Sequence, residues 1–166
     1  MKRDVIVNAL SGDGKNAYQL AEYYYRLDQA DEAFYWAARS AKAREPRAYL
    51  LLAEMYRFGI GTPMNISKAH KWYKKAIRVG SRDAIDYLAD DLMLGYGVRK
   101  NPAKALRLYR RSARMGSGYA EYKLGICLTV GLGVKKNKEF ARVHLSIACS
   151  RGVEQARWQL DCLHLA

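Results

Sequence analysis

The chain has 166 residues, of which 50% are hydrophobic, and its 29 Lys and Arg against 16 Asp and Glu give a net charge of +13. That hydrophobic fraction excludes a disordered chain, and the length suits one domain or one array of small repeats. No apolar run is long enough to span a membrane, and the positive charge favours an acidic partner: nucleic acid, an anionic membrane surface or an acidic protein.

The N-terminal residues predict neither a signal peptide nor a nucleotide site. The apolar stretch at residues 5–10 is short for a signal-peptide core, so a cytoplasmic location is expected. The glycines at residues 12–15 (GDGK) lack the spacing of a phosphate-binding loop and the Ser or Thr that follows its lysine.

Residues 16–44 are expected to form a first, degenerate pair of helices. Leu20 and Tyr24 recur at helical spacing in the first helix, as do Ala33 and Trp36 in the second. Their connection is short and lacks a Gly-x-Gly turn. Such atypical ends are common in repeat arrays, because they cover the hydrophobic surface that the last full repeat leaves open.

Three full repeats of 36 residues follow, at 45–80, 81–116 and 117–152. Each contains a Gly-x-Gly turn and an asparagine six residues after its first glycine. The turn glycines are Gly59, Gly61, Gly95, Gly97, Gly131 and Gly133. A period of this length is typical of arrays in which each repeat is one small supersecondary unit.

Within the first full repeat the periodicity is helical. Ala48 and Leu52 lie on one apolar face, and Gly59 is expected to end this helix because glycine adopts the left-handed conformation of a C-terminal cap. A second helix is expected to begin after Asn65 or Ser67.

Residues 153–166 are expected to form a single capping helix around Ala156 and Leu160. The sequence thus predicts one all-α domain over residues 1–166, a solenoid of antiparallel helix pairs with about nine helices.

The combined pattern resembles the Sel-like repeat (SLR) family, a relative of the tetratricopeptide repeats. It is carried by Leu124-Gly125 with Gly131-x-Gly133-Val134, by Gly95-x-Gly97-Val98 with Lys104-Ala105, and by Lys68-Ala69-x-x-Trp72-Tyr73 with Gly80. The resemblance is strong over residues 46–152, with departures at Ala53 and Ala89, where the family usually has glycine. It implies a right-handed superhelix whose first helices line a concave side, a role in protein–protein interaction, and no shared catalytic residues.

The second helices of the first two full repeats carry basic residues without any acid. Lysine and arginine recur on one convex face at Lys68, Lys71, Lys75, Arg78, Lys104, Arg107, Arg111 and Arg114. A solvated face explains such charges, but like charges four residues apart repel, and an ordinary exposed helix mixes both signs. The alternative reading is therefore a binding site for nucleic acid or another anionic surface, through phosphate contacts without base reading.

The tetratricopeptide pattern places another set of side chains on the concave groove. These are Tyr18, Glu22, Tyr25, Arg47, Leu50, Glu54, Arg57, Asp83, Asp86, Asp90, Tyr119 and Tyr122. Carboxylates flanked by tyrosines suit a partner segment that bears Lys or Arg, although solvated helix polarity explains them too. The main hypothesis is a scaffold or adaptor that binds, and in one version regulates, another protein through this groove.

The sequence predicts no enzyme, no cofactor and no metal site. The paired carboxylates have no nucleophile or cofactor motif beside them. Cys149, Cys162 and His164 have spacing too irregular to make a convincing zinc site. The odd number of cysteines, with Cys127 as the third, favours reduced, buried thiols. The sequence makes no prediction of oligomeric state.

Overall fold

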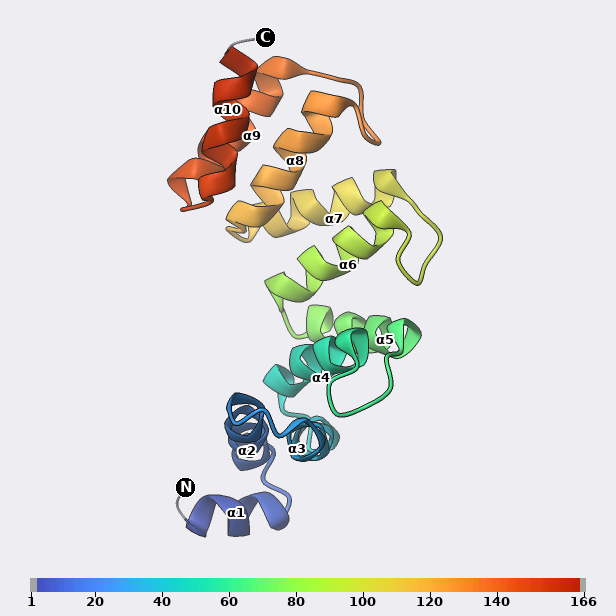
Figure 1. Ribbon diagram of the computed structural model, residues 1–166, viewed down its shortest axis with the longest axis vertical. Helices are drawn as coiled ribbons and strands as arrows, with labels where there is room; N and C mark the ends of the chain where they lie inside the picture. Colours follow the sequence, from blue (N-terminus) through green and yellow to red (C-terminus); the bar gives the residue numbers. More distant parts are fainter. Residues whose placement is uncertain (1–2, 165–166) are drawn as a thin grey trace. The chain divides into compact units, whose positions relative to one another are not determined.

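The computed structural model describes residues 3–164, and the side chains of residues 4–163. This part of the chain contains ten α-helices and no β-strand (Figure 1). They are α1 (Arg3–Leu10), α2 (Gly14–Arg26), α3 (Ala30–Lys42), α4 (Pro46–Phe58), α5 (Ile66–Arg78), α6 (Arg82–Leu94), α7 (Pro102–Arg114), α8 (Gly118–Val130), α9 (Lys138–Ser150) and α10 (Glu154–His164). The all-α prediction is confirmed. None of these helices is both long and apolar enough to cross a bilayer.

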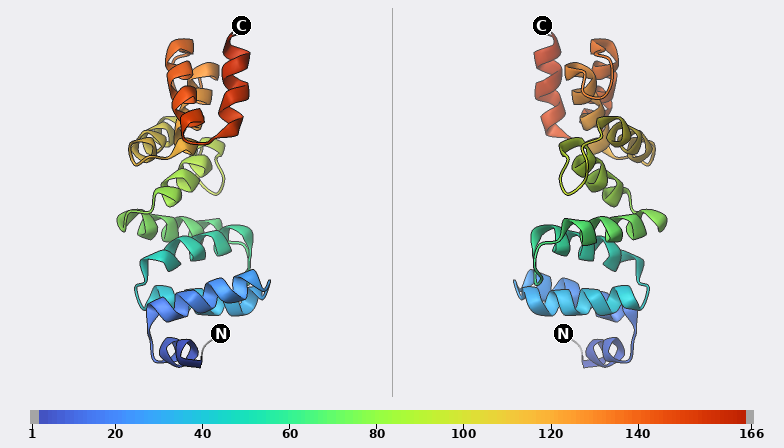
Figure 2. Two further views of the ribbon diagram at one scale, coloured as in Figure 1. Left: turned by 90° about the vertical axis from the view of Figure 1, so that its left-hand side faces the viewer. Right: turned by 90° about the vertical axis from the view of Figure 1, so that its right-hand side faces the viewer.

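The chain divides into two compact units, residues 1–81 and residues 82–166. In the first unit the most extensive contacts join α2 to α3 and α4 to α5, and in the second they join α6 to α7 and α8 to α9. Each of these pairs is antiparallel, as Figure 2 shows from two further sides. Helix α1 packs on α2, and α10 packs on α9. The predicted helix pairs are thus present, while the single-domain assignment and its repeat boundaries stay predictions.

The expected count of about nine helices is one short, and the helix that was not expected is α1. Its Ala9 is almost fully buried against the hydrophobic core of the first unit, and Val5 packs against the same core. Near its end, Ser11 Oγ donates a 2.8 Å hydrogen bond to the Asn8 carbonyl. A helix of 8 residues is too short to be stable alone, so packing against α2 stabilises it.

Asparagine begins the second helix of each full repeat. Asn65, Asn101 and Asn137 each accept a hydrogen bond from the backbone N–H three residues later, at 2.9, 2.9 and 3.0 Å. These bonds satisfy an N–H group that the first helical turn leaves without a partner in the helix. Of the two starts considered for α5, the structure has Asn65 and not Ser67 as the cap.

The two glycines of a turn do different things. Gly59 ends α4 in the left-handed conformation at φ 72°, as expected. Gly61, at φ 62°, lies against α3, where a Cβ on it would be 2.0 Å from the Ala30 carbonyl oxygen. In the second unit, a Cβ on Gly133 would lie 2.7 Å from Cβ of Pro102 at the start of α7. The second glycine therefore lets a turn pack against the second helix of the preceding pair.

Small and large buried residues both recur in the core at the same 36-residue step. One such position of the second helices is a fully buried alanine in all three repeats: Ala69, Ala105 and Ala141. Tyr73 and Tyr109 are also fully buried, whereas the third repeat has Leu145 at this step. Opposite Leu145 lies Gly125, and a Cβ there would be 2.6 Å from Leu145 Cγ. Close packing against Leu145 thus leaves no room for a side chain at position 125.

Candidate functional site

One face of α6 in the second unit carries three carboxylates, on Asp83, Asp86 and Asp90, at spacings of three and four residues. Together with Tyr87 and Tyr119 they line a pocket of about 290 Å³, which we name the acidic pocket. Four of these five residues are predicted groove residues. The structure therefore brings most of the predicted second-unit set together.

Asp90 is the most heavily hydrogen-bonded of the three carboxylates. It accepts hydrogen bonds from the hydroxyls of Tyr109 at 2.5 Å and Tyr119 at 2.6 Å, and Lys123 Nζ lies 3.4 Å away. Burial, followed by the hydrogen bond to Asp90, raises the pKa of both tyrosine hydroxyls well above the ordinary value. Lys123 Nζ also lies 4.9 Å from the centre of the Tyr119 ring. One ammonium group of the chain thus already contacts a carboxylate and an aromatic ring that line this pocket.

Asp86 and Asp83 lie in opposite environments. Asp86 is only 8% exposed, and it accepts a 2.7 Å hydrogen bond from Ser117 Oγ, the N-cap of α8. Burial raises the pKa of Asp86, while the nearby Ser112 hydroxyl and the hydrogen bond from Ser117 act in the opposite direction. The Asp83 side chain is 57% exposed and pairs with its neighbour Arg82, at 3.2 Å. Sequence reasoning treated the three carboxylates alike, but Asp83 is the one most open to a partner.

A second pocket lies in the first unit, between α2 and α4, with a volume of about 240 Å³. Six of the predicted groove residues line it: Tyr18, Glu22, Tyr25, Arg47, Leu50 and Glu54. The Tyr18 hydroxyl donates to Glu22 at 3.1 Å, and the Arg47 guanidinium lies 4.6 Å from the centre of the Tyr18 ring. Burial and the Glu22 carboxylate raise the pKa of Tyr18 to about 12. This first-unit pocket mixes both signs of charge around tyrosine.

Two predicted groove residues lie elsewhere. Arg57 is further along α4, where its guanidinium lies 5.6 Å from the centre of the Phe58 ring. Tyr122 packs against the hydrophobic cluster formed by α9 and α10. It is therefore part of the packing at the C-terminal end of the second unit.

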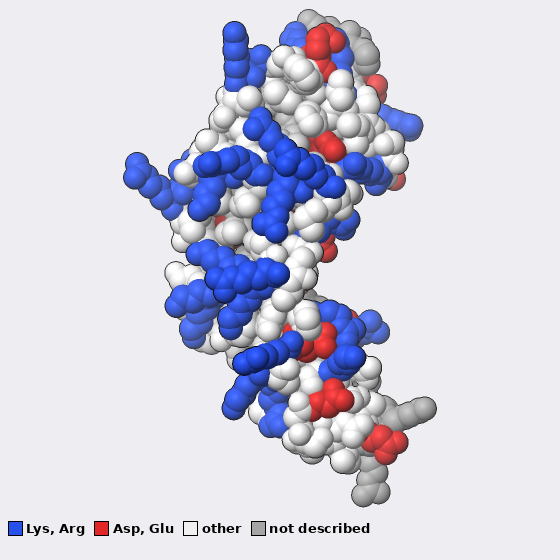
Figure 3. Space-filling view, turned by 180° about the vertical axis from the view of Figure 1, so that it is seen from behind, with Lys and Arg blue, Asp and Glu red and all other residues white. Residues whose placement is uncertain are grey.

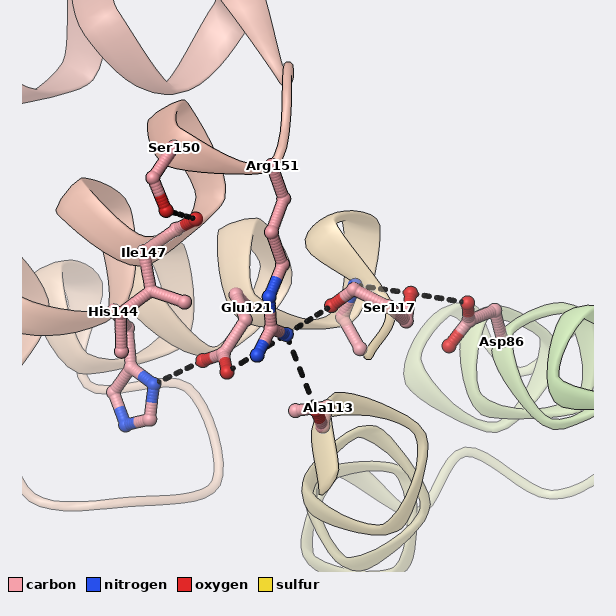
Figure 4. A network of polar contacts seen from close by, with 9 residues as sticks. Asp86, Ala113, Ser117, Glu121, His144, Ile147, Ser150 and Arg151 are labelled. Carbon is pink, nitrogen blue, oxygen red and sulfur yellow. Dashed lines mark hydrogen bonds and ion pairs between the residues drawn. The ribbon is translucent and has the colours of Figure 1, made fainter. Parts of the chain in front are cut away.

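Sequence reasoning missed an ion-pair network around the buried Glu121, in the first turn of α8 (Figure 4). His144 Nδ1 lies 2.6 Å from one Glu121 oxygen, and Arg151 Nη1 lies 3.2 Å from the other. Arg151 also donates to the carbonyls of Ala113 at 3.1 Å and Ser117 at 3.3 Å. The network joins the end of α7 and the start of α8 to α9, so its evident task is to hold the repeats together.

The basic side chains of α5 and α7 are exposed, as predicted, and neither helix contains an acid. Figure 3 shows lysine and arginine gathered over each of these helices. On α5, Lys75 Nζ lies 3.8 Å from the centre of the Trp72 ring, and Lys68 Nζ lies 5.1 Å from that of Tyr56. Within residues 4–163, no basic residue of α7 has an ion-pair partner. Each helix thus presents uncompensated positive charge.

The three cysteines differ in exposure, so the expectation of buried thiols is wrong for one of them. Cys127 is buried, Cys149 is partly buried and Cys162 is exposed, and none is in a disulfide. Burial raises the pKa of the Cys127 thiol, with Lys123 acting against this shift. The His164 side chain lies outside the described residues. Among the side chains that are described, no three His, Cys, Asp or Glu residues are placed to hold a metal ion.

Stacked helix pairs with glycine turns define a helical-repeat protein. The family model described as Sel1 repeat matches residues 46–81, 83–117 and 118–153, so the chain belongs to the Sel1 repeat family. Sel1 repeat proteins generally act in protein–protein interaction, and the family is typically non-enzymatic. The resemblance drawn from the sequence is confirmed.

Solved structures show the same fold. A Sel1 repeat protein from Oxalobacter formigenes is 28% identical, with a TM-score of 0.84 over 96% of this chain and 65% of that one. A protective antigen of uropathogenic Escherichia coli strains that displays an SLR fold is 27% identical, with a TM-score of 0.88 over 95% of this chain and 34% of that one. The predicted solenoid fold class is thus confirmed.

A curated relative is the chitin synthase regulator SKT5 of Saccharomyces cerevisiae. It is 36% identical over 85 residues, which are 47% of this chain and 12% of the yeast protein. This chain therefore spans less than two thirds of each of these three relatives.

Proposed function

We propose that this chain is an adaptor that binds a segment of a partner protein, and that the acidic pocket receives a lysine or arginine of that segment. The observation that carries the proposal is the position of Lys123, whose ammonium lies 3.4 Å from the Asp90 carboxylate and 4.9 Å from the centre of the Tyr119 ring. An incoming cation would find the same chemistry beside it, with the exposed Asp83 as its ion-pair partner. The carboxylates serve recognition in this proposal and perform no catalysis.

The first-unit pocket supports the same kind of binding. Its tyrosines provide large, rigid contact surfaces that lose little conformational entropy on binding. Glu22 and Glu54 provide acceptors, and Leu50 provides an apolar contact. Regulation of the bound protein and a cytoplasmic site of action are further parts of the proposal.

A library of random peptides displayed on phage, selected on the intact chain, tests the proposal. Enriched peptides should contain Lys or Arg, and Asp83→Lys should weaken their binding about tenfold or more, because it places like charges together. Asp31→Lys, at an exposed position in the first turn of α3, is the matched control and should change little. Enriched peptides that bind the Asp83→Lys variant as tightly as the parent would contradict the proposal.

A second candidate function is binding of nucleic acid or another polyanion by the outer faces of α5 and α7. The observation in its favour is that α7 carries only uncompensated positive charge. Such binding would rest on phosphate contacts and would weaken steeply as salt is added. The aromatic rings beside Lys68 and Lys75 face these cations, so base reading is not part of this function.

Fluorescence anisotropy with short RNA and DNA at low salt tests this second function. Reversal of the charge at Lys71, Lys75, Arg107 and Arg111 to glutamate should abolish binding. The matched control reverses four exposed cations elsewhere, Lys15, Arg26, Lys42 and Arg157, and so has the same net charge. Equal loss in both variants would mean that net charge alone attracts the nucleic acid, and the function would then not belong to these helices.

A further inference from the structure

Large apolar side chains are exposed at the turns of the second unit. Leu94 and Val130 are the last residues of α6 and α8, 36 positions apart, and they are 73% and 53% exposed. Phe140, in the first turn of α9, is 60% exposed. It occupies the repeat position that has Lys104 on α7. Large apolar side chains that are exposed together in this way indicate a contact surface.

The two turns of this unit lie next to each other. Both helix connections, α6 to α7 and α8 to α9, lie on one side of the unit in Figure 1. A Cβ on Gly133 of the second turn would lie 2.7 Å from Cβ of Pro102, which directly follows the first turn. The exposed apolar residues therefore share one edge.

Basic residues accompany the apolar ones on this edge. Arg99 and Lys100 follow the first turn, and Lys135 and Lys136 hold the same positions after the second; all four are exposed. The stem of Lys136 lies across the turn, with its Cγ 2.8 Å from where a Cβ on Gly131 would be, directly after Val130. The apolar and basic side chains are thus neighbours. We name this set the corner edge: Leu94, Arg99, Lys100, Val130, Lys135, Lys136 and Phe140.

The first unit has only the apolar half of this arrangement. Phe58 ends α4 and is 61% exposed, and Met64 is also 61% exposed. The positions that correspond to the basic pairs are Pro63 and Met64. The combination of apolar and basic residues therefore belongs to the turns of the second unit.

We infer that the corner edge docks the second unit onto an anionic bilayer surface. Phosphate groups would attract Arg99, Lys100, Lys135 and Lys136, and the apolar side chains would enter the boundary between headgroups and acyl chains. A nucleic acid backbone would use only the cations and would leave Leu94 and the other apolar residues in water. A folded protein would need a separate cavity for each projecting apolar side chain, whereas a fluid interface accepts them wherever they lie along the edge. This inference rests on neither of the two functions proposed above.

Co-sedimentation of the intact chain with vesicles tests the inference. One set contains phosphatidylcholine alone, and the other contains phosphatidylcholine and phosphatidylserine in equal parts. We expect binding to the anionic vesicles only. Replacing Lys100, Lys135 and Lys136 by Gln should weaken partitioning about fivefold for each charge, since a basic residue near such a surface contributes about 1 kcal/mol. Replacing Leu94, Val130 and Phe140 by Ser should weaken it about tenfold or more.

Matched controls remove equivalent groups from the first unit. Lys15, Lys42 and Arg44 to Gln remove three exposed charges that lie outside α5, and Leu27, Tyr35 and Val79 to Ser remove three side chains that are about half exposed. Both controls should bind the anionic vesicles within about twofold of the parent. Circular dichroism melting checks that every variant folds, which is expected because the altered side chains are exposed.

Three results would overturn the inference. The first is equal binding to both kinds of vesicle, or none, as a protein occupant of the edge would produce. The second is full binding by the Ser variant when the Gln variant has lost it, which would reduce the effect to attraction of any polyanion, nucleic acid included. The third is a loss in the first-unit controls as large as that in the corner-edge variants.

Discussion

The Tyr109 hydroxyl of α7 donates a 2.5 Å hydrogen bond to the Asp90 carboxylate of α6. Tyr109 is fully buried on the helix that carries the basic face, and Asp90 lines the acidic pocket. The bond thus connects the second helix of a repeat to the acidic pocket on its first helix. Through it, the core of the repeat sets the position of a carboxylate that the pocket presents.

Removing this hydroxyl should destabilise the fold. Tyr109→Phe keeps the ring but takes one donor from Asp90, and a hydrogen bond to a charged group contributes about 1.5–3 kcal/mol. Because the Tyr119 hydroxyl and Lys123 remain, we expect a loss of about 1–2 kcal/mol in the free energy of unfolding, measured by urea denaturation. Tyr35→Phe is the control, since that hydroxyl is exposed and its partner is Arg39. A loss no larger than in the control would show that the Tyr109–Asp90 bond contributes nothing.

Alkaline pH should destabilise the protein through tyrosines whose hydroxyls donate to carboxylates in the folded state. Folding raises the pKa of Tyr18 to about 12 and raises the pKa of Tyr109 and Tyr119 further, whereas the unfolded chain titrates near 10.0. The unfolded state therefore releases protons first, and stability that is present below about pH 10 is lost as the pH rises above it. Denaturation curves from about pH 8 to about pH 11 measure this slope. The Tyr109→Phe, Tyr119→Phe double variant should be less stable at the lower pH, but its free energy of unfolding should fall less steeply as the pH rises. An unchanged slope would show that these two tyrosines do not cause the loss of stability.

Alanine should destabilise the protein far more at the second glycine of the turn, Gly61, than at the glycine that ends the repeat, Gly80. Gly61 and Gly80 both have positive φ, at 62° and 91°, so alanine costs about 1–2 kcal/mol of backbone strain at either position. A methyl group on Gly80 meets nothing within 4 Å, but on Gly61 it would be 2.0 Å from the Ala30 carbonyl oxygen. We therefore expect Gly61→Ala to cost at least about 2 kcal/mol more than Gly80→Ala, because α3 must move. Thermal melts followed by circular dichroism compare the two, and equal losses would mean that the turn does not need this approach.

Removing Arg151 alone should destabilise the protein more than removing both charges of the Glu121–Arg151 pair. Arg151→Met leaves a buried carboxylate with only His144 beside it, and we expect a loss of about 1–3 kcal/mol, reduced from the value for a fully buried pair because the Arg151 side chain is 34% exposed. Adding Glu121→Gln should recover part of this loss, since the amide needs no counter-charge. A double-mutant cycle from urea denaturation gives the coupling. Additive losses would show that Glu121 and Arg151 do not stabilise each other.

The sequence by itself determined the period, the turns and the buried faces. Asn65, Asn101 and Asn137 mark helix starts because a cap acts within three residues, and Gly59 marks a helix end through its own backbone conformation. Helical spacing likewise identifies buried alanines such as Ala69. These features are local, so 36-residue repetition makes them readable without a structure.

Only the tertiary structure decided how the polar groups of different helices are paired. Asp83, Asp86 and Asp90 look alike in the sequence, but Asp90 is paired with side chains of α7 and α8 and the buried Asp86 with Ser117 at the start of α8. Asp83 stays exposed and pairs with the adjacent Arg82. The same holds for Glu121, whose partners are 23 and 30 residues away. Helix α1 too exists through its packing on α2. Spacing along one helix reports which residues share a face, whereas burial and pairing depend on side chains that a neighbouring helix brings to that face.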